Sequence, residues 1–383
     1  MNVIIKKCDE YVFEDVLIKM KEIFDLLGGV SSLIKPNSRV FIKCNCLGPF
    51  DKDLAITTHP TFLKAVISIV KEVTTDITVG DNPATRDLLP TLKKNGLYEV
   101  IVSENVKILD NKLLTTITNP NYKIYNSFEV SSGMLDCDVL INLPKLKTHS
   151  LAYMTCAEKN LFGFVYGLNK SAWHLKTRDF LEFSEAINDL YGAILNRFKD
   201  KTIINICDGI YGLEGDGPST GGKPINSKLI LASLDAVGLD RVALKKMGLD
   251  HNKSLITKIA AERNLGEANI DNIKILGDEV DDLKFLEPKN TLTEKTINTL
   301  RNGFVKGALL EHPKIDPNKC IKCGECTKIC PPKAMTKKDG KYPRLNISKC
   351  IRCWCCAEVC PKGAINKTKR PIIGKILLKE AKK

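Results

Sequence analysis

The chain has 383 residues, of which 43% are hydrophobic, so it can bury a large core and form two or three domains. No segment approaches the run of about twenty apolar residues that a membrane span requires, and the charged N-terminus lacks the apolar region of a signal peptide. The formal net charge of +13 comes entirely from the end of the chain, because residues 314–383 contain 19 basic and 5 acidic side chains. The rest of the chain contains 39 basic and 40 acidic side chains and is therefore nearly neutral. We therefore predict a cytoplasmic protein, from an organism that lives with little oxygen.

Short β-rich runs alternate with amphipathic helical stretches over the first three hundred residues. This pattern is typical of an α/β domain with a largely parallel sheet and flanking helices. We predict strands at residues 2–6, 39–44, 76–80, 137–143, 202–207, 228–234 and 272–277. We predict helices at residues 12–27, 60–73, 86–97, 183–198, 235–247 and 253–264.

The end of the chain has a different composition. We predict that residues 1–312 form the α/β domain and that residues 313–317, which include two prolines, form a linker. Residues 318–365 are expected to form a small ferredoxin-like α+β domain, and residues 366–383 a basic, helical tail.

Polar residues follow several of the predicted strands. Ligands of parallel sheets bind beyond the carboxyl ends of the strands, where neighbouring loops converge, so a pocket is expected there. The side chains that we expect to contact a cofactor are Asp81, Lys147, Asp208, Glu214 and Asp216. The alternative is that these residues lie on the loops without forming a pocket.

A glycine-rich loop spans residues 212–224. It matches neither the GxxxxGK[ST] nor the GxGxxG pattern, so the sequence does not support a nucleotide site. Glu214 and Asp216 lie in this loop and are candidates for a carboxylate pair that serves a metal or a proton transfer. A solvated turn is the alternative.

Two of the five histidines flank residues 150–173, which include Lys159. His149, Lys159 and His174 are spaced so that a loop and the start of a helix can bring them together. Imidazole and amine groups transfer protons near neutral pH, and an amine can hold an anionic substrate. We predict these three residues as the catalytic set, although an isolated histidine is more often structural.

Eight of the fifteen cysteines form two copies of the pattern CxxCxxCxxxCP, the ligand spacing of a two-cluster bacterial ferredoxin. In that arrangement the fourth cysteine of each copy binds the other cluster. We assign the first [4Fe–4S] cluster to Cys320, Cys323, Cys326 and Cys360. We assign the second to Cys350, Cys353, Cys356 and Cys330.

Other interpretations of the cysteines fit less well. Structural zinc uses paired knuckles with a different spacing, and disulfides require an oxidising compartment. Cys355 is surplus to the two patterns and is interpreted as a packing residue, with a ligand role as the alternative. The lysine-rich surface of this domain suits an acidic redox partner or is merely solvated, whereas no aromatic platform indicates nucleic-acid binding.

Six strings of the first domain resemble the bacterial and archaeal domain-of-unknown-function 362 family. They are TTHP (57–60), VGDNPA (79–84), CDVLINLPKLKTH (137–149), EKNLFGFVYG (158–167), DGIYGLEGDGPSTGGKP (208–224) and LDAVGLDRVAL (234–244). The resemblance implies an iron–sulfur protein, because fusion to a two-cluster ferredoxin module is common in that family. It leaves the reaction open.

A fainter similarity relates the first domain to lactate racemase, the nickel-pincer enzyme. The order of His149, Lys159 and His174 is similar to a His–Lys–His series of that family. There the first histidine is an acid or base, the lysine tethers the cofactor and the last histidine binds nickel. Here the sequence TCAE (155–158) replaces the glycine-containing run before the lysine, so only a ligand pocket is carried over.

Three functions are consistent with these features. The leading hypothesis is an oxidoreductase that passes single electrons through two [4Fe–4S] clusters to a substrate or an unidentified second cofactor or metal in the α/β domain. The second is an electron carrier that docks a partner without a reaction of its own. The third is a racemase-like or isomerase-like enzyme with structural clusters, for which a mass increment on Lys159 would be diagnostic.

Overall fold

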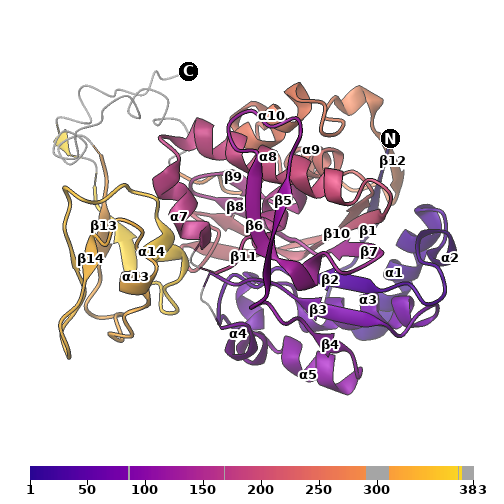
Figure 1. The fold of residues 1–383 in the computed structure, drawn as a ribbon, viewed down its shortest axis with the longest axis horizontal. Helices are drawn as coiled ribbons and strands as arrows, with labels where there is room; N and C mark the ends of the chain where they lie inside the picture. Colours follow the sequence, from indigo (N-terminus) through magenta and orange to yellow (C-terminus); the bar gives the residue numbers. More distant parts are fainter. Residues whose placement is uncertain (85–86, 168, 290–309, 370, 373–383) are drawn as a thin grey trace.

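The computed structural model describes residues 1–84, 87–167, 169–289, 310–369 and 371–372 (Figure 1). Among these residues ten strands form one mixed sheet, whose main path runs β12–β1–β11–β10–β7–β2–β3–β4. The strands of this path are β1 (Asn2–Lys7), β2 (Val40–Lys43), β3 (Ile77–Gly80), β4 (Lys107–Ile108), β7 (Val139–Asn142), β10 (Thr202–Gly215), β11 (Gly222–Ser233) and β12 (Lys274–Gly277). Two further strands, β8 (Lys145–His149) and β9 (Tyr153–Thr155), branch from β10.

Most of the sheet is parallel, as predicted. The pairs β10–β7, β7–β2, β2–β3 and β3–β4 are all parallel, whereas the long hairpin of β10 and β11 and the pair β11–β1 are antiparallel. Every residue of β2 and β7 is buried. Helices cover both faces of the parallel sheet, which explains why buried and exposed residues do not alternate along these strands. The polar exceptions are the buried residues Lys43 and Asn142 at the carboxyl ends of the two strands.

Two groups of helices cover the sheet on opposite sides (Figure 1). The first group consists of α1 (Phe13–Leu26), α3 (Pro60–Lys71), α4 (Leu88–Asn95) and α5 (Leu97–Ser103). The second consists of α6 (Ala157–Leu161), α8 (Phe180–Arg197), α9 (Ala236–Lys246) and α10 (Leu255–Glu262).

The predicted helix at residues 86–97 is interrupted. Gly96 adopts a left-handed conformation with φ of 75°, which ends α4 and lets α5 start in a new direction. Residue 86 itself lies outside the described residues. The helix predicted at 183–198 begins earlier, at Phe180, because the Asp179 side chain accepts a hydrogen bond from the Glu182 amide and caps the first turn.

The second domain lies against the first beside α7 (Asn169–Lys176) (Figure 1). It contains two short antiparallel ladders and two single-turn helices. The elements are β13 (Pro313–Ile315) with β16 (Ile365–Lys367), β14 (Met335–Thr336) with β15 (Arg344–Leu345), α13 (Glu325–Lys328) and α14 (Cys355–Glu358). The segment predicted as a linker, residues 313–317, therefore carries the first strand of this domain. Most of the predicted basic tail, residue 370 and residues 373–383, lies outside the described residues.

No helix in the described part of the chain is long and apolar enough to cross a membrane.

Candidate functional site

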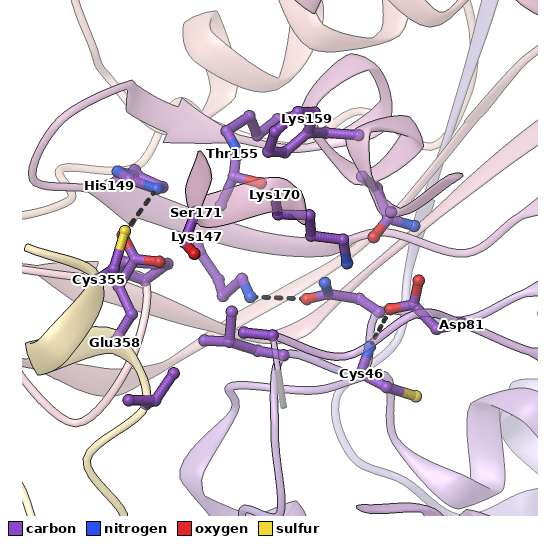
Figure 2. Close-up of a pocket in the computed structure, with 18 of the residues that line it drawn as sticks. Cys46, Asp81, Lys147, His149, Thr155, Lys159, Lys170, Ser171, Cys355 and Glu358 are labelled. Carbon is purple, nitrogen blue, oxygen red and sulfur yellow. Dashed lines mark hydrogen bonds and ion pairs between the residues drawn. The ribbon is translucent and has the colours of Figure 1, made fainter. Parts of the chain in front are cut away.

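A cavity of about 90 Å³ lies between the two domains, and we call it the interdomain cavity (Figure 2). The cluster domain contributes Ile329, Cys355, Glu358 and Val359 to its wall. The α/β domain contributes the rest. These residues are Asn45, Cys46, Leu47, Asp81, Ala84, Lys147, His149, Thr155, Lys159, Asn160, Phe162, Gly163, Lys170, Ser171, His174, Phe183 and Pro218.

His149 is the last residue of β8 and is buried. Its Nδ1 accepts hydrogen bonds from the amides of Leu151, at 3.0 Å, and Ala152, at 3.1 Å. A neutral imidazole that accepts at Nδ1 carries its proton on Nε2. That nitrogen lies 3.6 Å from Oε1 of Glu358, across the domain boundary. Burial, with the lysine cations nearby, holds the pKa of His149 well below its ordinary value, so the ring is neutral at pH 7 and presents an Nε2–H donor to Glu358.

Lys147 lies two residues before His149 on β8. Residues two apart in a strand point to the same face, which explains why both side chains reach the cavity. The Lys147 Nζ donates to Asn45 Oδ1 at 2.6 Å and to the Ile56 carbonyl at 2.8 Å. Burial, with the Lys145 cation nearby, lowers the pKa of Lys147 to about 7.

Lys159 and His174 come from two helices, α6 and α7, and both lie beside the Phe183 ring. The Lys159 Nζ lies over the rings of Phe162 and Phe183, at 4.6 and 5.8 Å from their centroids, and makes no hydrogen bond or ion pair with any residue that the structure describes. Burial lowers its pKa. The His174 ring stacks on Phe183 with a centroid distance of 4.2 Å, and burial lowers its pKa to about 3. The structure thus brings the three predicted catalytic residues to one cavity.

Asp81 lies at the floor of the cavity, and both oxygens of its carboxylate already have partners within the protein. Its Oδ1 lies 2.8 Å from the Nζ of Lys43 and also accepts from the Asn82 amide. Its Oδ2 accepts from the Cys46 amide at 2.8 Å. A Cβ atom at Gly163 would stand 2.5 Å from both members of the ion pair, so only glycine allows this close approach. Asp81 therefore fixes the loops beneath the cavity.

Three predicted cofactor-contacting residues lie elsewhere. Asp208 is fully buried between the Lys145 Nζ, at 3.0 Å, and the Tyr11 hydroxyl, at 2.6 Å. Glu214 accepts from the Leu286 amide, and Asp216 accepts from the Lys289 amide. None of the three lines the interdomain cavity. Within the described ranges, no group of three or more His, Cys, Asp or Glu side chains converges on the position of a single metal ion. The cysteines of a [4Fe–4S] cluster are a different case, because each of them binds a different iron.

The cluster cysteines lie in two groups. The four assigned to the first cluster line one small cavity of about 20 Å³, together with residues such as Ile315 and Pro343. Burial raises the pKa of Cys350, whose neighbouring thiols are Cys353 and Cys330. Cys330 thus lies with the second motif, and Cys360, the fourth cysteine of that motif, lies with the first.

Comparison with known proteins gives the family. The family model described as Domain of unknown function (DUF362) matches residues 40–245, and the model of a 4Fe-4S dicluster domain matches residues 307–366. A thylakoid-associated protein of Synechocystis sp. is 30% identical over 266 residues, which cover 69% of this chain and 79% of the relative. The chain belongs to the DUF362 family.

Two solved structures are similar to this DUF362 protein in fold. They are the lactate racemase apoprotein of Thermoanaerobacterium thermosaccharolyticum, with 15% identity and a TM-score of 0.37, and a Thermotoga maritima protein, with 10% identity and a TM-score of 0.40. The matches cover 62% and 67% of this chain and 55% and 60% of the respective structures.

The DUF362 protein thus carries an iron–sulfur domain, and its thiols fit clusters. Four cysteines around one cavity are the donor set of a cubane. Burial, with the thiols of Cys323, Cys360 and Cys320 nearby, raises the pKa of Cys326 to about 12, so without iron this thiol is protonated at pH 7. Iron would bind the thiolate form and displace the proton.

Several cavity residues were missed by the sequence analysis. Lys170, on α7, donates to the Asn82 carbonyl, and burial lowers its pKa to about 8. It lies four residues before His174, on the same face of the helix, so helical spacing from His174 was the available signal. Glu358 and Cys355 had no such signal, because they reach the cavity only through docking of the cluster domain.

Lys147 should make stability depend on pH. In the unfolded chain its pKa is near the ordinary 10.5, so between pH 7 and 10.5 the unfolded state binds more protons and the free energy of unfolding rises with pH. Lys147→Met removes this contribution. Urea unfolding measured from pH 6.5 to 9.5 should show the free energy of unfolding of the variant falling, relative to that of the wild type, by up to about 1.4 kcal/mol per pH unit. A difference that does not change with pH would contradict the low pKa.

Proposed function

We propose that this DUF362 protein is an oxidoreductase that passes single electrons through two [4Fe–4S] clusters to a substrate or second cofactor in the interdomain cavity. One observation carries the proposal: the cavity wall includes Cys355, which is adjacent in the chain to the assigned cluster ligand Cys356. Consecutive Cα atoms are about 3.8 Å apart, so a ligand in the cavity would lie beside the second cluster. The clusters, when bound, supply the single electrons.

His149 is suited to stabilise an oxyanion that develops during reduction. Two backbone amides fix its tautomer, so the Nε2 proton points toward the opposite wall. A neutral imidazole donates a hydrogen bond to a developing oxyanion, and the lysine ammonium groups, whose pKa values are lowered, supply the proton that accompanies reduction. Lys147, Lys159 and Lys170 also supply the positive charge that would hold a small anionic substrate.

An acidic redox protein is the proposed electron donor or acceptor. The described part of the cluster domain carries many lysines, and a surface of one sign steers a partner of the opposite sign. No cysteine of the described residues forms a disulfide, which supports a reducing compartment such as the cytoplasm.

The proposal can be tested by single-turnover reoxidation. Anaerobically purified protein is reduced with dithionite, freed of reductant and mixed with the small-molecule fraction of an extract of the source cells, while cluster absorbance is followed. The wild type should reoxidise at least tenfold faster than a variant with alanine at His149, Lys159 and His174. Both proteins must hold the same iron, which the analysis of iron, sulfide and nickel verifies.

Equal reoxidation rates in the two proteins would contradict the proposal. They would favour an electron carrier whose large domain only docks a partner, because the cavity would then be dispensable.

A further inference from the structure

The interdomain cavity has more positive charge than its carboxylates neutralise. Lys147 and Lys170 donate only to neutral oxygens, an amide side chain and two backbone carbonyls. The Lys159 ammonium lies over aromatic rings, and the Glu358 carboxylate is the acidic group that acts on it. Asp81 is already matched by Lys43. Glu358 is the remaining carboxylate of the described cavity wall, so three ammonium groups face one carboxylate. Buried charges of this kind call for an anionic ligand.

One wall of the same cavity is apolar. The rings of Phe162 and Phe183 line it, and the His174 ring stacks on Phe183 and continues the surface. A cavity of about 90 Å³ is smaller than an apolar cavity of about 150 Å³ that binds benzene, so it admits a molecule of only a few heavy atoms. An inorganic tetrahedral anion would leave its oxygens against these rings, whereas an organic acid places carbon there.

A larger groove lies beside the cavity along the domain boundary. This groove, of about 640 Å³, is formed by the glycine-rich loop and the cluster domain. Pro218 and Glu358 line both the groove and the interdomain cavity, so the two spaces are neighbours.

We propose that the interdomain cavity binds a small organic carboxylate, with its carboxylate group at Lys159, Lys170 and Lys147 and its carbon chain against Phe162 and Phe183. This inference rests on the proposed function, because it names the substrate class of the same site.

Binding of a carboxylate should take up protons. Burial lowers the pKa of Lys147 to about 7 and that of Lys170 to about 8 in the free protein. An anion favours the charged ammonium and raises both pKa values, so binding weakens as pH rises above 7. A purely structural role for these lysines would produce no proton uptake.

Isothermal titration calorimetry of the anaerobic, cluster-loaded full chain tests the proposal. The probes are propionate, its neutral isostere propionamide, and inorganic phosphate, at pH 6.5 and 8.5 in buffers of different ionisation enthalpy. We expect propionate to bind at least tenfold more tightly than propionamide and phosphate, and more tightly at pH 6.5 than at pH 8.5, with proton uptake. Lys159→Gln and Lys170→Gln should each weaken propionate binding roughly tenfold or more. Lys176→Gln, on the exposed side of the helix that carries Lys170, should leave it unchanged.

Equal affinity for propionate and propionamide, or no binding of either, would overturn the proposal, and both results come from the wild type and need no variant to fold. Tighter binding of phosphate would overturn it in favour of an inorganic-anion site. Failure of carboxylate binding and failure of the proposed electron transfer can be told apart, because the two experiments measure different properties. Propionate binding without electron transfer would leave the ligand class standing, and electron transfer without carboxylate preference would leave the oxidoreductase standing.

Discussion

Replacing Cys356 by alanine should remove about half of the iron and sulfide, whereas replacing the adjacent Cys355 should leave both clusters in place. Cys356 lies near the thiols of Cys353, Cys350, Cys326 and Cys330, and all of these except Cys326 are assigned to the second cluster. Cys355 instead lines the interdomain cavity. Wild-type protein with two cubanes should hold about eight irons per chain and show coupled EPR signals after reduction.

The measurement is iron and sulfide analysis together with EPR of dithionite-reduced protein, with Cys355→Ala as the matched control. If Cys355→Ala lost iron and Cys356→Ala did not, Cys355 would be the ligand and the assignment of Cys356 would be wrong. The exchange of fourth ligands adds a sharper test. Cys360→Ala should abolish the first cluster and spare the second, even though Cys360 belongs to the second motif.

Asp81→Ala should lower the free energy of unfolding by about 3–5 kcal/mol, the largest effect that we expect outside the cluster ligands. Both members of the Lys43–Asp81 pair are buried, and the Asp81 carboxylate also binds two backbone amides beneath the cavity. Removing the carboxylate leaves the Lys43 ammonium buried without its counter-charge, which costs far more than the pair itself contributes.

Urea unfolding of the variants measures this effect as a shift of the midpoint. The control is Asp136→Ala, because Asp136 forms an exposed ion pair with Arg39 and its loss should change the free energy of unfolding by at most about 1 kcal/mol. The double variant Lys43→Met/Asp81→Leu should recover most of the lost stability, since it removes both charges. Equal midpoint shifts for Asp81→Ala and Asp136→Ala would show that Lys43 is not isolated by burial.

The fold was largely predictable because its strands are apolar on both faces. Runs such as residues 137–143 can only be buried strands, and each of the seven predicted strands corresponds to a strand of the sheet. The strand β8 was missed, because its sequence KLKTH appears polar although every residue in it is buried. Its lysines can be buried because each has a specific partner: Lys145 contacts Tyr11 and Asp208, and Lys147 donates a hydrogen bond to Asn45.

The site was predictable only in part. The order of His149, Lys159 and His174 indicated a shared pocket, and all three do line one cavity. Glu214 and Asp216 looked equally suited to chemistry, but each is engaged by a backbone amide away from that cavity. The part of the cavity wall that the cluster domain forms could not be predicted from the sequence. It depends on which surfaces of the two domains are in contact, and such contacts produce no local sequence pattern.

A redox titration followed by EPR shows whether the interdomain cavity communicates with the clusters. At pH 6.5 Lys147 and Lys170 are already mostly protonated, so bound propionate adds negative charge beside the second cluster. Reduction adds a further negative charge, and the two repel each other. Saturating propionate should therefore lower the midpoint potential of the second cluster more than that of the first. Unchanged potentials in protein that binds propionate would contradict the account.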